Sequence, residues 1–525
     1  APLDESEMTS DRIDTAGLLL THGSGAEFRL LWARRPAEAE PLGGFWSFVV
    51  GRVEAIDAES PVDGSTQGLG QVRFASCALR ELFEEFGLLA LSDGLIRSWR
   101  DDPPSPFDSW TSYRTQLRND AAHFASDLRE ADLSLQTSRL RHMGGWTTPE
   151  WMPESFHTEF FQMHLSDAEM TSLELDELPR RADRHEMARA EWIAPSKALS
   201  RWAEGEAMLT TPLRLLIEHL DDARGPIDAA RLDNEFSHID KDGPIEIVRG
   251  IRLLPIPTVT LPPATHTNAY VLGRNELVVV DPGSGKPEAL EPLCDALDTL
   301  TGNGATVRAV ILTHHHSDHI GGAGAVRDRY DCELWAHEAT VERLHGLGAN
   351  RLLKDGESIS LSTEDNDDLV VLHTPGHAPG HLSILHRRSH TMLVGDLMAS
   401  EGTIVIDPPD GHMGSYMESL ERVQDLEPRQ LLPAHGMPIA NPMERLQFYL
   451  DHRMARERSV LEALEHNNKK LRPIDLVPHV YDEVPKHLWP LAARSLEAHL
   501  IHLVEEEYAH TDGEEYWPNV ERQGV

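Results

Sequence analysis

Cysteine is scarce in this chain, which has only three among its 525 residues. Cys77, Cys294 and Cys332 are odd in number and far apart, which excludes a disulfide scaffold and indicates a reducing compartment. Apolar runs of about 18 residues, the length that spans a bilayer, are absent as well. The first residues are acidic and polar, unlike a secretory signal peptide. We therefore expect a cytoplasmic protein without a membrane partner.

Positive charge is also in short supply. The chain has 48 Lys and Arg residues against 87 Asp and Glu residues, a net charge of −39. A field of this sign repels phosphate backbones over most of the surface, so nucleic acid is disfavoured as a partner. A local cationic site stays compatible with this charge. We expect a small-molecule substrate, and the sequence leaves open whether the chain forms a homo-oligomer.

The chain is long enough for three or four units at roughly 150 residues per domain. Short apolar runs and a periodic helical stretch indicate a first unit that ends near residue 222. After a stretch without a sustained apolar pattern, strand-like runs alternate with helical ones, as in an α/β domain. The predicted boundaries are 1–222 for the first domain, 223–245 for a linker, 246–445 for the α/β domain, 446–510 for a helical segment and 511–525 for a polar tail.

The densest chemical signal is THHHSDHIGG, residues 313–322, which follows the apolar run AVIL. Histidine and aspartate alternate on what should be a tight loop at a strand end. Imidazole and carboxylate ligands suit zinc, iron or manganese, with zinc the default. Further candidates also follow apolar runs, so the metal-ligating candidates are His314, His316, Asp318, His319, His377, Asp396 and His435.

These motifs resemble the metallo-β-lactamase superfamily over roughly residues 245–445: DPG, HxHxDH, TPGH, GD and a final His occur in the family's order. The resemblance implies a four-layer αββα sandwich with two metal ions at one edge of its sheets. It also implies a catalytic part for Asp318 and support of the site by His381. By position, His314, His316 and His377 would bind the first metal, Asp318, His319 and His435 the second, and Asp396 both.

An aspartate at 396, where common zinc β-lactamases carry cysteine, indicates branches that cleave thioesters or phosphodiesters. Residues 250–505 look most like the β-lactamase-like protein 2 group, whose members end in a winged-helix-like domain and include a single-strand endoribonuclease. Residues 446–510 hold eight basic against eleven acidic residues, whereas an RNA-binding domain should be net basic. We therefore rank a small-molecule hydrolase above a ribonuclease.

A second signal is RELFEEFGL, residues 80–88, in a stretch with helical periodicity. Glu81, Glu84 and Glu85 lie at i, i+3 and i+4, so one helix face presents all three. Carboxylates gathered in this way suit Mg²⁺ or Mn²⁺. Arg80 is placed to orient Glu81.

This stretch resembles the second half of a Nudix box, REUxEExGU, where U is a bulky aliphatic residue. The first half is displaced, with Gly51, Asp57 and an insertion before the helix, as in the peroxisomal coenzyme A diphosphatase branch. The resemblance covers roughly residues 12–222 and implies a Nudix α/β/α sandwich. It assigns Arg80 and Glu81 to catalysis and Glu81, Glu84 and Glu85 to the metal. Val50 replaces a usual glycine, and Asp57 replaces a usual glutamate.

The sequence as a whole predicts a multidomain α/β and α+β protein: a Nudix domain followed by a metallo-β-lactamase-fold hydrolase and a winged-helix-like segment. The second half would act on a small thioester, ester or phosphoester. Two alternatives stay open. The second half could be an endoribonuclease, and the first half could be a ligand-binding or interaction module without activity.

Overall fold

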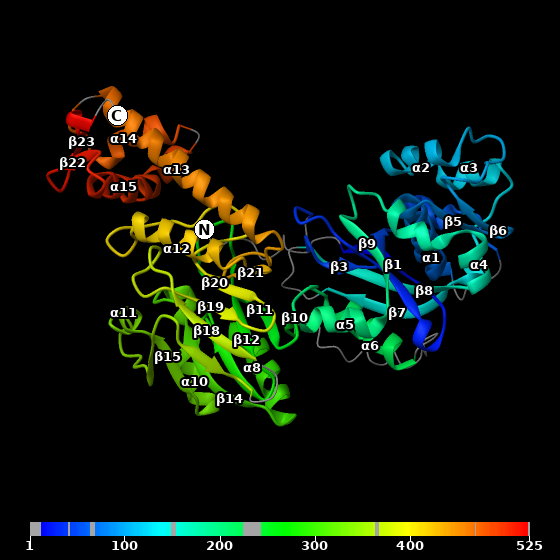
Figure 1. Cartoon of the computed structure of the whole chain (residues 1–525), viewed down its shortest axis with the longest axis horizontal. Coiled ribbons are helices and arrows are strands. Elements are labelled where there is room, and N and C mark those ends of the chain that lie inside the picture. The colour runs from blue at the N-terminus through cyan, green and yellow to red at the C-terminus, as the bar shows by residue number, and fades with distance from the viewer. Residues whose placement is uncertain are drawn as a thin grey trace. The chain divides into compact units, whose positions relative to one another are not determined.

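The computed structural model describes residues 12–39, 42–63, 69–148, 154–223, 243–362, 367–467, 469–482 and 484–522. The chain divides into two compact units, Ala1–Val248 and Arg249–Val525 (Figure 1). The linker predicted over 223–245 falls almost wholly outside the described residues. Every helix in the described ranges is too short or too polar to cross a bilayer.

A seven-stranded sheet forms the centre of the first unit. Its order is β3-β2-β1-β8-β7, with β4 paired to β1 and β9 to β2. The two central strands, β1 and β8, run parallel along their whole length. The strands are β1 (Ile13–His22), β2 (Arg29–Arg34), β3 (Trp46–Ser47), β4 (Val49–Arg52), β7 (Arg141–Thr147), β8 (Phe156–Leu165) and β9 (Arg189–Ile193), and a separate hairpin joins β5 (Leu88–Leu91) to β6 (Gly94–Arg97).

Helices cover both faces of this sheet. Phe160 and Phe161 are neighbours on β8 and point to opposite faces, because side chains alternate along a strand. Phe161 packs in a core with α1 (Leu69–Phe86), and Phe160 packs in another with α5 (Pro195–Ala203) and α6 (Thr211–Ala223). The other helices are α2 (Trp110–Asn119), α3 (Phe124–Glu130) and α4 (Asp167–Ser172), with 3-10 turns η1 (Gly25–Glu27), η2 (Ala55–Glu59), η3 (Thr137–Arg139) and η4 (Leu175–Arg181).

The helix α1 carries the predicted carboxylates. Leu79, Leu82 and Phe86 recur at spacings of three and four residues and are all buried in the same core. Gly87, at φ +75°, ends the helix in the left-handed conformation, and its N–H bonds to Phe83 O at 2.8 Å. The turn at Gly87 therefore fixes where β5 begins, and it fixes the orientation of the helix face that carries the carboxylates.

Two sheets form the centre of the second unit, with orders β11-β12-β13-β14-β15-β16 and β17-β18-β19-β20-β21. The first contains β11 (Ile251–Pro257), β12 (His266–Leu272), β13 (Glu276–Val280), β14 (Thr306–Leu312), β15 (Glu333–His337) and β16 (Arg351–Leu353), and the short strand β10 (Ile245–Val248) ends the first unit. The second contains β17 (Ser358–Ser360), β18 (Asp368–His373), β19 (Leu382–His386), β20 (Thr391–Gly395) and β21 (Gln430–Pro433).

Both faces of these sheets are buried. Val278 and Val279, adjacent on β13, are each fully buried, and Val371 and Leu372, adjacent on β18, are 0% and 6% exposed. Helices α8 (Pro287–Gly302) and α10 (Ala323–Tyr330) share a core with the first sheet, and α12 (Met413–Asp425) and α13 (Pro442–Asn467) share one with the second (Figure 1). The short helices α9 (Ser317–Ile320) and α11 (Glu338–Val341) follow β14 and β15. This is the four-layer αββα arrangement expected from the sequence.

The C-terminal part adds a smaller core. It is built from α13, α14 (Pro473–Val480), α15 (Trp489–Glu505) and a hairpin of β22 (Ala509–Thr511) and β23 (Tyr516–Pro518), with turns η5 (Lys486–Leu488) and η6 (Val520–Arg522). The segment 511–525 was expected to be a polar tail. In the structure residues 509–518 form a hairpin instead, because Tyr516 is buried in this core and bonds to the backbone of Leu471.

One buried side chain ties the two sheets together. Asn268 on β12 donates from Nδ2 to Pro433 O at 2.9 Å and to Gly436 O at 2.7 Å, at the end of β21. Tyr270 also donates to Pro433 O, at 2.7 Å. Because Asn268 is buried, its loss would leave the Gly436 carbonyl without this donor.

We expect Asn268→Ala to lower the free energy of unfolding by about 1–3 kcal/mol, the cost of unpaired buried polar groups. Calorimetric unfolding of the full chain would measure this. Asn303→Ala, at an exposed helix end, is the matched control and should change stability by less than about 0.5 kcal/mol. Equal effects of the two changes would contradict the role of Asn268.

Candidate metal centres

All seven predicted ligands of the second unit lie where strands end. The segment after β14 supplies four of them, two in the loop and two in α9. The others follow β18, β20 and β21. Their donor atoms form two groups, each with its members within 4.8 Å of one another: His314, His316, His377 and Asp396 in the first, and Asp318, His319 and His435 in the second.

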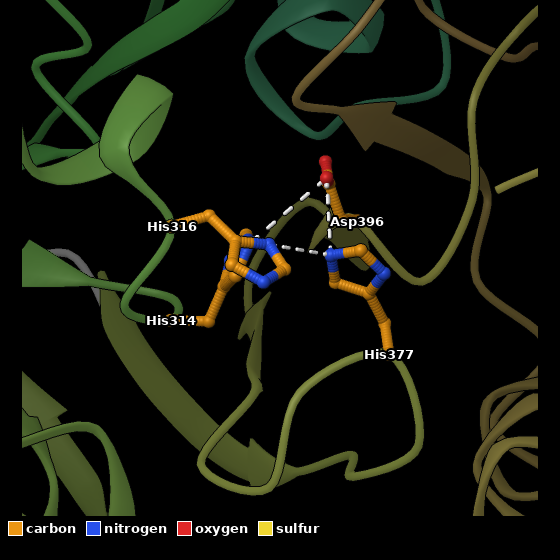
Figure 2. A group of neighbouring side chains, drawn as sticks. All are labelled: His314, His316, His377 and Asp396. Carbon is orange, nitrogen blue, oxygen red and sulfur yellow. Dashed lines mark hydrogen bonds and ion pairs between the residues drawn. The ribbon is translucent and has the colours of Figure 1, made fainter. Parts of the chain in front are cut away.

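In the first group, three imidazole nitrogens converge on one point (Figure 2). His316 Nδ1 lies 2.9 Å from His314 Nε2 and 3.0 Å from His377 Nε2. Asp396 Oδ2 completes the group at 3.4 Å from His377 Nε2. Ring nitrogens that face one another so closely are arranged as ligands of a shared cation, with the carboxylate supplying negative charge.

Asp396 faces both groups. Its second oxygen, Oδ1, lies 3.3 Å from His435 Nε2 and 3.5 Å from His319 Nε2. His435 Nε2 in turn lies 3.6 Å from Asp318 Oδ2. One carboxylate therefore has an oxygen directed at each group, as expected for a residue that serves two cations.

Hydrogen bonds on the outer side of the rings determine which nitrogen faces inward. His377 Nδ1 bonds to Val405 O at 2.9 Å, and His435 Nδ1 bonds to His266 O at 2.8 Å. His319 Nδ1 bonds to Asp281 Oδ2 at 2.8 Å. Since carbonyl and carboxylate oxygens accept, Nδ1 donates in each ring, and Nε2 faces the centre.

Burial sets the protonation of the three rings in the first group, whereas in the second group the Asp396 carboxylate outweighs burial and raises the pKa values of His319 and His435. Burial and the neighbouring histidines lower the pKa of His316 to about 4, and burial also lowers those of His314 and His377. These rings are therefore neutral near pH 7, the form that binds metal. Burial opposes the charge of Asp396, but His319 and His435 hold the pKa of its carboxyl well below the ordinary value.

The donor set fits transition-metal ions. His319 Nε2 and Asp396 Oδ1 are buried and make no hydrogen bond among the described residues. Orphaned polar atoms inside a protein are costly unless a cation or water satisfies them. A centre of imidazoles and carboxylates is the chemistry that zinc, iron and manganese prefer, so the residues present fit two such ions.

A third group lies in the first unit. Glu81, Glu85 and Glu186 place carboxylate oxygens within 4.8 Å of one another. Burial and the neighbouring carboxylates raise the pKa of Glu85 well above its ordinary value, and its Oε2 is buried without a hydrogen bond. A hard divalent cation would relieve this repulsion, so the group fits Mg²⁺ or Mn²⁺. Glu84, predicted to be a ligand, is not among its members.

A buried arginine pairs with Glu84, which explains why Glu84 is not a member of this group. Arg80, 1% exposed, donates from Nη1 to Glu84 Oε1 and to Glu81 Oε1, each at 2.9 Å. It also binds both oxygens of Asp57, at 2.9 and 3.0 Å. The displaced acid of the split motif thus meets the helix despite the insertion, and Arg80 orients Glu81 as predicted.

A cavity of about 220 Å³ lies beside this group in the first unit. Gly51 and Val50 form part of its wall, together with Arg35, whose Nε is buried and makes no hydrogen bond within the part of the chain that the structure describes. Gly51 is required here, because a Cβ would lie 1.8 Å from the carboxyl carbon of Glu81. Five aromatic side chains line the rest: Phe45, Trp46, Trp146, Phe156 and Phe160.

Comparison with known proteins identifies the second unit. Residues 262–435 match the metallo-β-lactamase superfamily, and residues 473–517 match the β-lactamase-associated winged helix domain. A β-lactamase-like protein 2 homolog of Drosophila melanogaster is 30% identical over 257 residues, which cover 46% of this chain and 82% of that protein. The chain belongs to the metallo-β-lactamase superfamily. It is a metallo-hydrolase with the αββα fold and a C-terminal winged helix.

Two further proteins are similar to parts of this metallo-β-lactamase-superfamily chain. An atrochrysone carboxyl ACP thioesterase of Aspergillus fumigatus is 29% identical over 209 residues, 40% of this chain and 62% of that protein. The crystal structure of a NUDIX hydrolase from Alicyclobacillus acidocaldarius covers 43% of this chain and 96% of its own, at 24% identity and a TM-score of 0.34.

Sequence reasoning missed three contributors to these sites. Glu186 lies in a loop whose sequence has no periodicity that would place it beside α1. Val405 and His266 contribute carbonyl groups, which no side-chain pattern can show. His381 was predicted to support the metallo-β-lactamase site, and its Nε2 accepts from Asp396 N at 3.0 Å.

We expect the purified protein to carry about two transition-metal ions per chain in the second unit, because seven ligands are present. Asp396→Ala should reduce this content, since it removes an oxygen from each group. Metal analysis after gel filtration measures the change. Asp328→Ala, an exposed carboxylate paired with Arg327, is the control and should retain wild-type content. Full metal content in Asp396→Ala would contradict the assignment.

Proposed function

We propose that the second unit hydrolyses a small thioester, ester or phosphoester at a dinuclear centre. The observation that carries this proposal is Asp396, with one oxygen directed at each group of ligands. The thioesterase among the relatives favours the thioester within this class. Asp396 in place of a cysteine agrees with the same choice.

The chain's own residues supply position and protonation. Two divalent cations bound here would lower the pKa of a bound water and stabilise the negative charge that develops on the substrate. Val405, His266 and Asp281 hold three imidazoles with Nε2 inward. Asp318 is the least buried member of the second group. In this proposal its carboxylate accepts a proton from the water that attacks the substrate.

A hydrolase panel tests this proposal. Thioesters, esters, phosphoesters and a single-stranded RNA would be offered to the full chain and to Asp396→Ala. We expect thioester turnover in the wild type and a loss in Asp396→Ala greater than the 10–100-fold typical of residues that only support a ligand. RNA cleavage alone would favour the endoribonuclease alternative, and metal-free activity would overturn both.

For the first unit we propose a Nudix-type hydrolase of nucleoside-diphosphate-like molecules, with coenzyme A-type substrates the leading candidates. The support is the group of Glu81, Glu85 and Glu186 beside an aromatic cavity. Arg35 lines that cavity, and its buried Nε makes no hydrogen bond among the described residues, which suits a phosphate group. The alternative is a ligand-binding module without turnover, because Val50 forms part of the cavity wall where a glycine is usual.

We expect the first unit to turn over slowly because Val50 places two methyl groups where a diphosphate must approach the backbone. Val50→Gly should raise Mg²⁺-dependent release of a nucleoside monophosphate or phosphopantetheine. Gly51→Ala is the matched opposite change and should abolish release, since its Cβ meets Glu81. Wild-type turnover on the order of 1–10³ per second would contradict the crowding argument.

Glu84→Gln should leave the second unit's hydrolysis unchanged. The substitution alters a contact of Arg80 in one compact unit, whereas the imidazole groups lie in the other. Steady-state kinetics on the second unit's substrate measures this, with Asp396→Ala as the positive control for loss. If a folded Glu84→Gln protein had a lower kcat on the second unit's substrate, the prediction that the two sites are independent would be wrong.

A further inference from the structure

The loop between β20 and α12, residues 396–412, carries two parts of the metal centre. Asp396 begins it, and Val405 in its middle supplies the carbonyl that accepts from His377 Nδ1 at 2.9 Å. The segment 396–412 contains no helix or strand. Its carbonyl groups must therefore find partners outside regular structure.

One face of α13 supplies those partners. Arg445, Tyr449 and Arg453 recur every four residues, so they lie on the same side of the helix. Arg445 Nη2 donates to Ala399 O at 3.0 Å and to Gly402 O at 2.8 Å. Tyr449 Oη accepts from Ala399 N at 3.0 Å.

Arg453 makes the contact nearest the metal ligand. Its side chain is 3% exposed, and Nη2 donates to Ile404 O, the carbonyl adjacent to Val405. The guanidinium also lies over the ring of Tyr416, 5.3 Å from its centroid. Arginine stays charged at any physiological pH and donates in a rigid plane, so a buried contact of this kind fixes the carbonyl it binds.

Helix α15 holds the far half of the same loop. Arg494 Nε lies 2.5 Å from Asp407 Oδ1, and Glu505 Oε1 lies 3.0 Å from His412 Nε2. The loop is thus bound at both ends of the segment that contains Val405. Residues 442–467, which form α13, fall between the two stretches that match known families.

We propose that the C-terminal helices are a structural part of the metal centre, with Arg453 as a positioning residue for His377. The hydrogen bond from Arg453 fixes Ile404 O. The adjacent carbonyl, Val405 O, is thereby kept in place to accept from His377 Nδ1. That bond keeps the proton on Nδ1 and directs Nε2 to the first group of ligands. The proposal rests on the metal centre proposed above and gives α13 a function that neither family match assigns.

Arg453→Met removes the donor and keeps an unbranched apolar side chain of similar length. Arg453→Lys keeps the charge and can restore one hydrogen bond. Arg456→Met is the matched control, because Arg456 lies on the same helix and donates to a backbone carbonyl, that of Val480, outside the loop. All three would be made in the full chain and loaded with Co²⁺, whose visible absorption reports ligand geometry.

We expect Arg453→Met to weaken metal binding at the first group by about 10–100-fold, as for other residues that orient a ligand. Its Co²⁺ spectrum should change and its kcat should fall with little change in KM. Arg453→Lys should recover part of the affinity. Arg456→Met should lower the stability of the protein and leave its metal affinity unchanged. If Arg453→Met does not fold, Arg494→Gln, at a half-exposed ion pair, should give a smaller shift in the same direction.

The outcomes separate this proposal from the one it rests on. A wild-type chain that binds no metal would contradict the metal centre itself. A wild-type chain with two ions and an Arg453→Met variant with the same affinity and spectrum would overturn only the role of Arg453. Equal losses in Arg453→Met and Arg456→Met would overturn it too, because they would show a general effect of C-terminal packing.

Discussion

The metal centre depends on one buried carboxylate, Asp281. It accepts from Thr313 N at 2.8 Å, from Thr313 Oγ1 at 2.6 Å and from His319 Nδ1 at 2.8 Å. It thus joins the end of β13 to the segment after β14 and to α9. Asp281 has φ +48°, a conformation that aspartate tolerates better than most residues. The chain turns there and directs the carboxylate at the segment after β14 that carries four ligands.

Close backbone approach is the second constraint at this edge. A Cβ on Gly321 would lie 2.4 Å from Gly283 O, and the Gly283 N–H bonds to His319 O. The glycines after the histidine motif therefore allow the DPG loop and α9 to pack directly. Without that contact, Asp281 could not reach His319, so the two motifs form one structural unit although they are separated in the sequence.

The two units solve the same electrostatic problem with different donors. In the second, burial lowers the pKa values of His314, His316 and His377, whereas at His319 and His435 the Asp396 carboxylate outweighs burial and raises them. In the first, carboxylates gather on α1 and are balanced by Arg80, which takes Glu84 and Asp57 away from the group of potential ligands. Arg80 thereby pairs with Glu84 and Asp57 and also contacts Glu81, which belongs to the group that is open to a hard cation.

The sequence by itself determined where ligands occur and on which elements. A histidine motif after an apolar run predicts a loop at a strand end, and carboxylates at i and i+4 share a helix face, because both follow from the local repeat of the backbone. Tertiary structure alone decided that Glu186 joins Glu81 and Glu85, that residues 509–518 form a hairpin rather than a polar tail, and that Val405 orients His377. The reason is physical. Local periodicity directs a side chain relative to its own element, whereas meetings between distant loops depend on how whole layers pack and on which buried polar groups must be satisfied.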